Sequence, residues 1–151
     1  MKTLLLTIFA FALFAGCSGN ATREFTAEQF RIQITRTECF GRCPAYTLSI
    51  TGDGACTLEG RKNVDNIGKF KRTISKELVA ELAQGVEDCN FFSLENEYTA
   101  QITDLPTTFI SAKLYDNTKT IRDYHGAPEK LRRLEAKLDS IRRLDGWAEA
   151  K

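Results

Sequence analysis

The sequence predicts an α+β fold in a single domain. It should hold a largely antiparallel sheet of about six strands and two helices, one in mid-chain and one long helix near the C-terminus. Several segments between residues 30 and 124 alternate apolar and polar residues, which is typical of strands that bury one face. Two segments, residues 75–88 and 128–144, instead place apolar residues at helical spacing. Because runs of strands are separated by single helices, the order favours α+β over an alternating α/β fold.

The first predicted strand covers residues 30–35 and directs three apolar side chains to one face, those of Phe30, Ile32 and Ile34. Residues 46–51 repeat this alternation, and residues 55–59 resume it after Gly52-Asp53-Gly54. Since glycine accepts the positive φ of tight turns, this combination indicates a β-hairpin. A weaker strand follows at residues 69–73, and its charged side chains predict water on one of its faces.

The first helix is predicted from Ser75, a good N-cap residue, to about Asp88. Its apolar stripe consists of Leu78, Val79, Leu82 and Val86. Residues 107–114 and 118–124 then form a second hairpin around Asp116-Asn117. The last helix begins with Pro128 as its first residue, because the missing N–H of proline costs nothing there. Its stripe consists of Leu131, Leu134, Leu138, Ile141 and Leu144.

The N-terminus resembles a bacterial lipoprotein signal. Lys2 precedes an apolar run from Leu4 to Phe14, which is long enough for a secretory signal and too short to span a bilayer. The run ends in Leu13-Phe14-Ala15-Gly16-Cys17, which matches the lipobox pattern except that Phe14 stands where Leu is usual. Cys17 is therefore the predicted lipidation site.

These features divide the chain into a signal peptide at residues 1–16, a lipidated N-terminus and tether at residues 17–29, and one domain at residues 30–147. Two or three acyl chains on Cys17, such as palmitate, would hold the protein on membrane lipid stably, because each buried methylene contributes about 0.8 kcal/mol. We expect a lipid-anchored protein of the bacterial cell envelope. Ser18, rather than Asp, follows Cys17 and favours the outer membrane if the host is Gram-negative.

The four remaining cysteines are Cys39, Cys43, Cys56 and Cys89, and an oxidising envelope makes disulfides the expectation. Cys39 and Cys43 can meet if the backbone folds back at Gly41, which predicts a disulfide-closed loop between the first two strands. Cys56 and Cys89 both continue apolar faces, so they are either linked, clamping helix to sheet, or two buried free thiols. The linked form is slightly favoured.

Several segments resemble the motifs of DUF6438, a bacterial domain of unknown function. They are residues 36–46 around the Cys39–Cys43 pair, Gly52-Asp53-Gly54, Thr103-Asp104-Leu105-Pro106 and Asp123-Tyr124-His125-Gly126-Ala127-Pro128. The resemblance runs from about Phe30 to Trp147. It implies a small envelope domain, often on lipoproteins, and no established activity.

The function that these observations favour is a non-enzymatic binding or structural module of the envelope, with a protein or glycan as its unknown partner. We expect no cofactor, no metal site and no catalytic residue, because the chain has one histidine and lacks phosphate-loop and nucleophile-elbow motifs. The net charge of +1 gives no reason to expect nucleic acid. The expected interaction surface consists of loop residues Phe40, Arg42, Asp104, Tyr124 and His125.

Two alternatives stay open. The Cys39/Cys43 loop could act in thiol–disulfide exchange, with Arg42 lowering a thiolate pKa, although three intervening residues in a strand connection are unlike the usual redox spacing. Asp104, Tyr124 and His125 could instead perform acid–base chemistry. This second alternative is weaker, because a polar histidine at a strand end needs no catalytic explanation.

Overall fold

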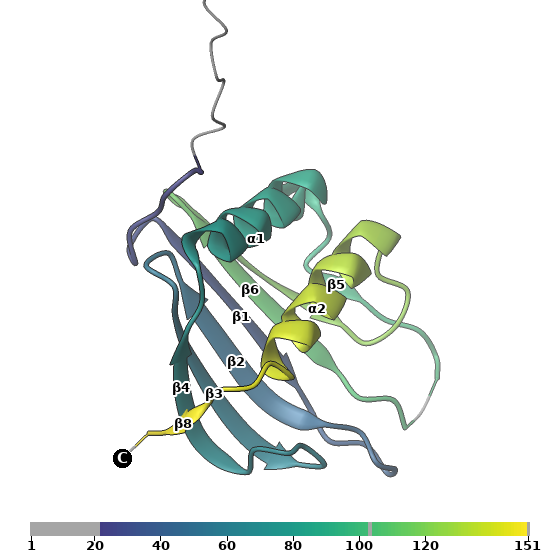
Figure 1. Cartoon of the computed structure of the whole chain (residues 1–151). Coiled ribbons are helices and arrows are strands. Elements are labelled where there is room, and N and C mark those ends of the chain that lie inside the picture. The colour runs from purple at the N-terminus through teal and green to yellow at the C-terminus, as the bar shows by residue number, and fades with distance from the viewer. Residues whose placement is uncertain (1–21, 103, 151) are drawn as a thin grey trace, which may run out of the picture.

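The computed structural model describes residues 22–102 and 104–150 and has the expected architecture, a single α+β domain with two helices packed on one face of an open sheet (Figure 1). The strands are β1 (Phe30–Arg36), β2 (Ala45–Thr51), β3 (Ala55–Lys62), β4 (Gly68–Thr73), β5 (Glu97–Tyr98), β6 (Thr108–Leu114), β7 (Asn117–Asp123) and β8 (Ala148–Glu149). The helical segments are α1 (Lys76–Asp88), the short 3₁₀ turn η1 (Phe91–Ser93) and α2 (Glu129–Arg142).

The sheet has eight strands in the order β5-β7-β6-β1-β2-β3-β4-β8, so the expectation of about six strands was wrong. The two additional strands, β5 and β8, lie at the edges and contain two residues each. Two residues are too few to show an alternating pattern, which is why the sequence did not reveal them. Every neighbouring pair is antiparallel except β5 and β7.

The core lies between the sheet and the helices. Alternate residues of β1 and β2 are almost completely buried there, as their sequence period predicts. Ser75 caps α1 by accepting a 3.3 Å hydrogen bond from the amide of Leu78, which confirms the predicted start of this helix. The helical stripe on α2 is also buried, except that Leu144 lies beyond the end of the helix and is 41% exposed.

The sequence pattern predicted Pro128 as the first helical residue of α2, but Pro128 is the N-cap. Its φ of −57° suits a helix, but its ψ of 148° is extended, so the helix begins at Glu129. The Pro128 carbonyl still accepts the first helical hydrogen bond, from the amide of Arg132 at 3.1 Å.

Cys56 and Cys89 are both buried and are free thiols, so the favoured link between them was wrong. Cys56 pairs in register with Arg72, just before α1 begins, whereas Cys89 directly follows the last residue of α1. A helix of 13 residues is about 20 Å long, so the two sulfurs lie near opposite ends of α1. Two residues that both face the core can therefore still lie far apart within it.

The chain enters the sheet at one end and forms its disulfide loop at the other. Phe25 packs against Phe30 at the start of β1, with ring centroids 5.5 Å apart, and seven residues of β1 then cross the sheet. Strand register brings three connections to the far end, at residues 37–44, 63–67 and 99–107. We call this end the distal end; it is at the bottom of Figure 1. Within the part of the chain that the structure describes, no helix is long and apolar enough to cross a bilayer.

Candidate binding surface at the distal end

The loop between β1 and β2 is closed by a disulfide between Cys39 and Cys43, whose Cα atoms are 5.7 Å apart. The loop is also tied to its neighbours. The side-chain amide of Asn63 donates a 3.1 Å hydrogen bond to the Cys43 carbonyl, and the amide of Thr37 donates a 3.0 Å bond to the Thr107 carbonyl. Because the loop is held from both sides, Phe40 at its tip stays in solvent and is 95% exposed.

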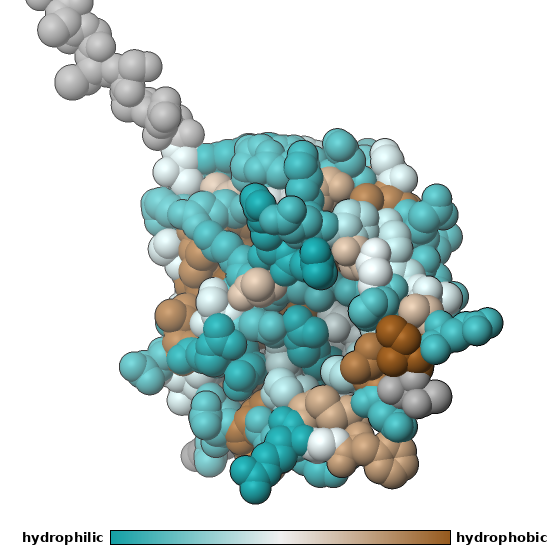
Figure 2. All heavy atoms as spheres, turned by 90° about the vertical axis from the view of Figure 1, so that its right-hand side faces the viewer, coloured by the Kyte–Doolittle hydropathy of each residue, from teal (hydrophilic) through white to brown (hydrophobic). Residues whose placement is uncertain are grey.

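Exposed apolar side chains gather at this end. Among the described residues, seven large apolar side chains are exposed, and four of them belong to the three distal connections: Phe40, Ile67, Ile102 and Leu105. Figure 2 shows one group of brown side chains at the lower right of one face, toward the distal end, besides smaller brown areas elsewhere. A groove of about 470 Å³ is lined by two of the four exposed side chains, Phe40 and Leu105, together with Glu38, Cys39, Lys62 and Asp104. We call it the apolar groove.

The residues expected to form the interaction surface divide into three groups. Phe40 and Asp104 line the apolar groove, and Arg42 is exposed in the same loop. Tyr124 stabilises the connection at residues 99–107. Its hydroxyl donates a 2.6 Å hydrogen bond to the Ile102 carbonyl and accepts one of 3.4 Å from the Leu105 amide. His125 is exposed but is not among the residues that line the groove.

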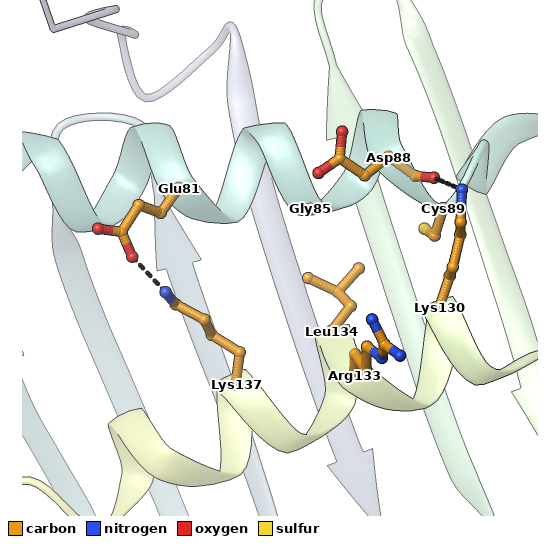
Figure 3. Close-up of a pocket in the computed structure, with 8 residues that line it drawn as sticks. All are labelled: Glu81, Gly85, Asp88, Cys89, Lys130, Arg133, Leu134 and Lys137. Carbon is orange, nitrogen blue, oxygen red and sulfur yellow. Dashed lines mark hydrogen bonds and ion pairs between the residues drawn. The ribbon is translucent and has the colours of Figure 1, made fainter.

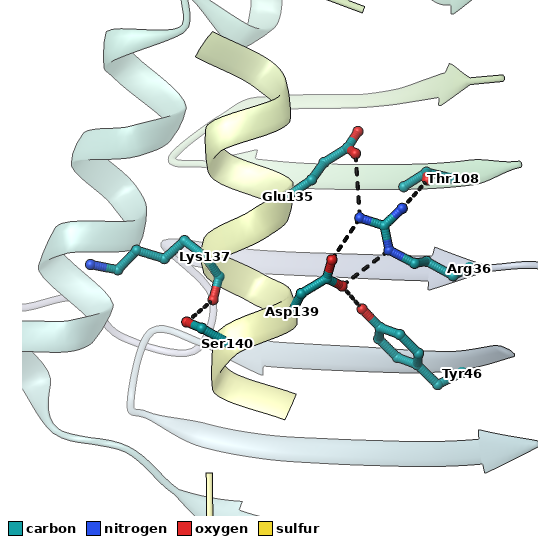
Figure 4. A network of polar contacts seen from close by, with 7 residues as sticks. All are labelled: Arg36, Tyr46, Thr108, Glu135, Lys137, Asp139 and Ser140. Atoms are coloured by element: carbon teal, nitrogen blue, oxygen red, sulfur yellow. Dashed lines mark hydrogen bonds and ion pairs between the residues drawn. The ribbon is translucent and has the colours of Figure 1, made fainter. Parts of the chain in front are cut away.

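A second cavity adjoins the apolar groove and shares Leu105 with it. This charged cleft of about 350 Å³ lies between α2 and the distal ends of β1, β6 and β7. Arg36 is at its centre. The Arg36 guanidinium donates to both carboxylate oxygens of Asp139, at 3.0 and 2.8 Å, and to the hydroxyl of Thr108 at 2.7 Å (Figure 4). The hydroxyl of Tyr46 also donates to Asp139.

Glu135 is the unusual residue of the cleft. It is 4% exposed, and its Oε2 lies 3.6 Å from the Arg36 guanidinium, while its Oε1 has no hydrogen-bond partner in the part of the chain that the structure describes. Burial raises the pKa of Glu135 to about 7, and the negative charges of Asp123 and Asp139 add to this effect against the opposing charge of Arg36. Burial also raises the pKa of Asp123, whose Oδ1 likewise lacks a partner. The cleft therefore offers unused hydrogen-bond acceptors.

Comparison with known protein families gives a match to the model described as "Domain of unknown function (DUF6438)", over residues 30–142. The chain belongs to the DUF6438 family. The matched region contains the disulfide loop and every residue of the charged cleft. No curated protein matches the chain.

Sequence reasoning missed the cleft of this DUF6438 domain, although a signal was present. Arg36 continues the alternation of Ile32 and Ile34 and so falls on the buried face of β1. Glu135 is four residues after Leu131 and three before Leu138, which places it within the apolar stripe of α2. A charged residue in phase with buried apolar neighbours indicates a buried ion pair or a site.

A third cavity of the DUF6438 domain separates the two helices (Figure 3). Lys137 on α2 forms an ion pair with Glu81 on α1, and Lys130 donates a 3.1 Å hydrogen bond to the carbonyl of Asp88. Gly85 allows this close packing, because a Cβ there would lie 3.1 Å from the Cδ1 of Leu134. Figure 3 shows these two contacts bridging one helix to the other, whereas Arg133 pairs with Glu129 on its own helix, so the polar groups of this cavity have structural partners.

Proposed function

We propose that this protein is a lipid-anchored lipoprotein of the bacterial cell envelope whose DUF6438 domain binds a partner through its distal end. One observation carries the proposal. A disulfide-closed loop holds Phe40 95% exposed, and three further exposed apolar side chains lie in the distal connections. Phe40 and Leu105 line one groove, and exposed apolar side chains that lie together mark a contact site more often than scattered ones do.

The position of the surface suits an anchored protein. An anchor on Cys17 would join the domain close to the start of β1, and the apolar groove lies beyond the end of β1. Seven strand residues at about 3.3 Å each place the two ends roughly 20 Å apart. The proposed binding surface would then face away from the membrane.

A protein is the favoured partner. Aliphatic side chains predominate at the surface, whereas sugars stack mainly on aromatic rings, and Phe40 is the single aromatic residue among those that line the groove. Lys62, Glu38 and Asp104 line the same groove and supply charges of both signs beside its apolar side chains. The thiol-exchange alternative has less support, because the Cys39–Cys43 pair joins two strands and does not lie at a helix N-terminus, where thiolates are stabilised.

Two measurements test the proposal. Mass spectrometry of the natively expressed protein should find an acylated Cys17 as the first residue; an intact leader or an unmodified N-terminus would contradict the anchor. The second measurement compares chemical cross-linking in native membranes between wild type and Phe40→Ser. The expected result is a specific cross-linked protein that the variant loses.

The matched control for this comparison is Phe109→Ser, because Phe109 is also an exposed phenylalanine, at 37%, but lies within β6 and outside the apolar groove. The control should keep the cross-linked partner. A partner retained by Phe40→Ser, or lost equally by both variants, would show that the distal surface is not the binding site. A cross-link to glycan alone would show that the partner is a glycan and not a protein.

A further inference from the structure

The charged cleft contains two buried acceptor atoms, Glu135 Oε1 and Asp123 Oδ1, that have no hydrogen-bond partner among the described residues. The nearest cation cannot satisfy them fully. The guanidinium of Arg36 already donates two hydrogen bonds to Asp139 and one to Thr108, and it reaches Glu135 only at 3.6 Å and on the other oxygen. Buried carboxylate oxygens without donors are costly, so this part of the cleft is suited to a donor from outside.

We propose that the charged cleft binds the primary ammonium group of a lysine side chain, with Glu135 Oε1 as its main acceptor. This inference rests on the proposed function and deepens it, because the cleft and the apolar groove share Leu105 and one partner segment can occupy both. The ligand is thus a lysine presented by the bound protein.

The size of the charged cleft and the residues that line it favour a ligand with an ammonium group on a flexible side chain. The cleft is about 350 Å³ and is bordered by Leu105 and Pro106, along which the four methylenes of a lysine side chain can lie. An ammonium has three rotatable donors and can adapt to one main acceptor, whereas a planar guanidinium needs two acceptors in fixed geometry.

The charges around Glu135 allow a cation to enter. The groups facing it are Arg36 on β1, Asp123 on β7, and Arg132 and Asp139 on α2. Arg36 and Asp139 neutralise each other. Arg132 opposes a cation, but it is exposed, so solvent screens its charge. The two carboxyl groups that remain make the interior of the cleft acidic.

The empty cleft would hold a proton on Glu135 below about pH 7, in accordance with the raised pKa of this carboxyl. Binding of the ammonium replaces that proton, which leaves to solvent, and the carboxylate then accepts from the ammonium. Affinity should therefore increase as the pH rises through about 7 and stay constant above it until the lysine ammonium itself loses its proton, near about pH 10.

The test uses the full-length protein and, as probe, a tripeptide with blocked ends and lysine in the middle. NMR should show saturable shifts of the amides of Ala136 and Tyr124, which line the cleft. Glu135→Gln should weaken binding at least about tenfold, because it removes a charge-assisted hydrogen bond. Its matched control is Glu81→Gln, which removes an exposed carboxylate in the cavity between the helices and should leave binding unchanged.

Three results would overturn the inference: no binding of the lysine peptide, equal binding of the same peptide acetylated on the lysine Nζ, or unchanged affinity in Glu135→Gln. Thermal melts check that each variant is folded, and Asp123→Asn offers a second variant with the same expected weakening. Failure of the lysine site can be distinguished from failure of the proposed binding surface. If Phe40→Ser abolishes the native cross-link while the lysine peptide does not bind, the distal surface stands and the lysine site falls.

Discussion

Arg36 on β1 and Asp139 on α2 form a two-bond ion pair across the interface between sheet and helix, with Nε–Oδ1 and Nη2–Oδ2 distances of 3.0 and 2.8 Å. The two residues are 103 positions apart in the chain. The side chains are only 20% and 23% exposed, so the pair is largely shielded from water. It fixes the position of α2 over the end of β1 and so forms one wall of the charged cleft.

The first prediction concerns this pair. Asp139→Asn should lower the free energy of unfolding by about 2–3 kcal/mol, because it leaves the largely buried guanidinium of Arg36 without its main counter-charge. Tyr46 loses a charged acceptor in the same variant. Urea unfolding followed by circular dichroism measures the change.

The control for that prediction is Glu129→Gln, which breaks the ion pair between Glu129 and Arg133 on the exposed side of α2. Exposed pairs contribute little, so this variant should unfold with the same midpoint as wild type. Equal midpoints for Asp139→Asn and wild type would mean that the Arg36–Asp139 pair does not hold the helix in place.

The second prediction concerns pH. The pKa of Glu135 is raised from about 4.5 to about 7 in the folded protein, so the folded state holds a proton that the unfolded state has released between these values. Its contribution to stability is therefore complete below about pH 4.5 and is lost as the pH rises to about 7. The raised pKa of Asp123 acts in the same direction.

Glu135→Gln tests the pH prediction, since glutamine stays neutral at every pH. The variant should match wild type near pH 4.5 and unfold at higher denaturant at pH 8, with a gain on the order of 2–3 kcal/mol. Unfolding curves across this pH range measure the gain. A difference that does not change with pH would show that Glu135 is ionised throughout.

Regular elements were predictable from the sequence because local patterns determine them. The alternation in β1 and the cap at Ser75 each depend on neighbouring residues only, and both were correct. The site was less predictable, because it depends on distant contacts. Arg36 meets Asp139 only after β1 and α2 pack together, and no local pattern gives that pairing.

The cysteines show the same division. The spacing of Cys39 and Cys43 determines whether they can meet, since only three residues separate them. For Cys56 and Cys89 the periodic pattern predicted that each side chain is buried but not its position along α1, and that position keeps them apart. A periodic pattern predicts which side of an element is buried, and tertiary packing decides which buried residues are neighbours.

The third prediction concerns the disulfide loop. Replacing Cys39 and Cys43 together by serine should lower the free energy of unfolding by about 2 kcal/mol, the value expected for closing a loop of about five residues. Hydrogen exchange should become faster in residues 37–44 and remain unchanged in α1, which lies toward the opposite end of the sheet (Figure 1). Uniformly faster exchange would instead mean that the bond supports the whole domain.

The fourth prediction concerns the free thiols. Burial raises the pKa of Cys56 to about 11 and also raises that of Cys89, so neither forms an appreciable thiolate in the folded protein at pH 8. Iodoacetamide should therefore modify neither residue until denaturant is added, and should then modify both without any reductant. Mass spectrometry counts the modified sites. Cys39 and Cys43 should stay unmodified without reductant, because they are bonded to each other. If Cys56 and Cys89 also stayed unmodified in the denatured, unreduced protein, they would be bonded to each other, and α1 would have to be shorter or placed differently on the sheet.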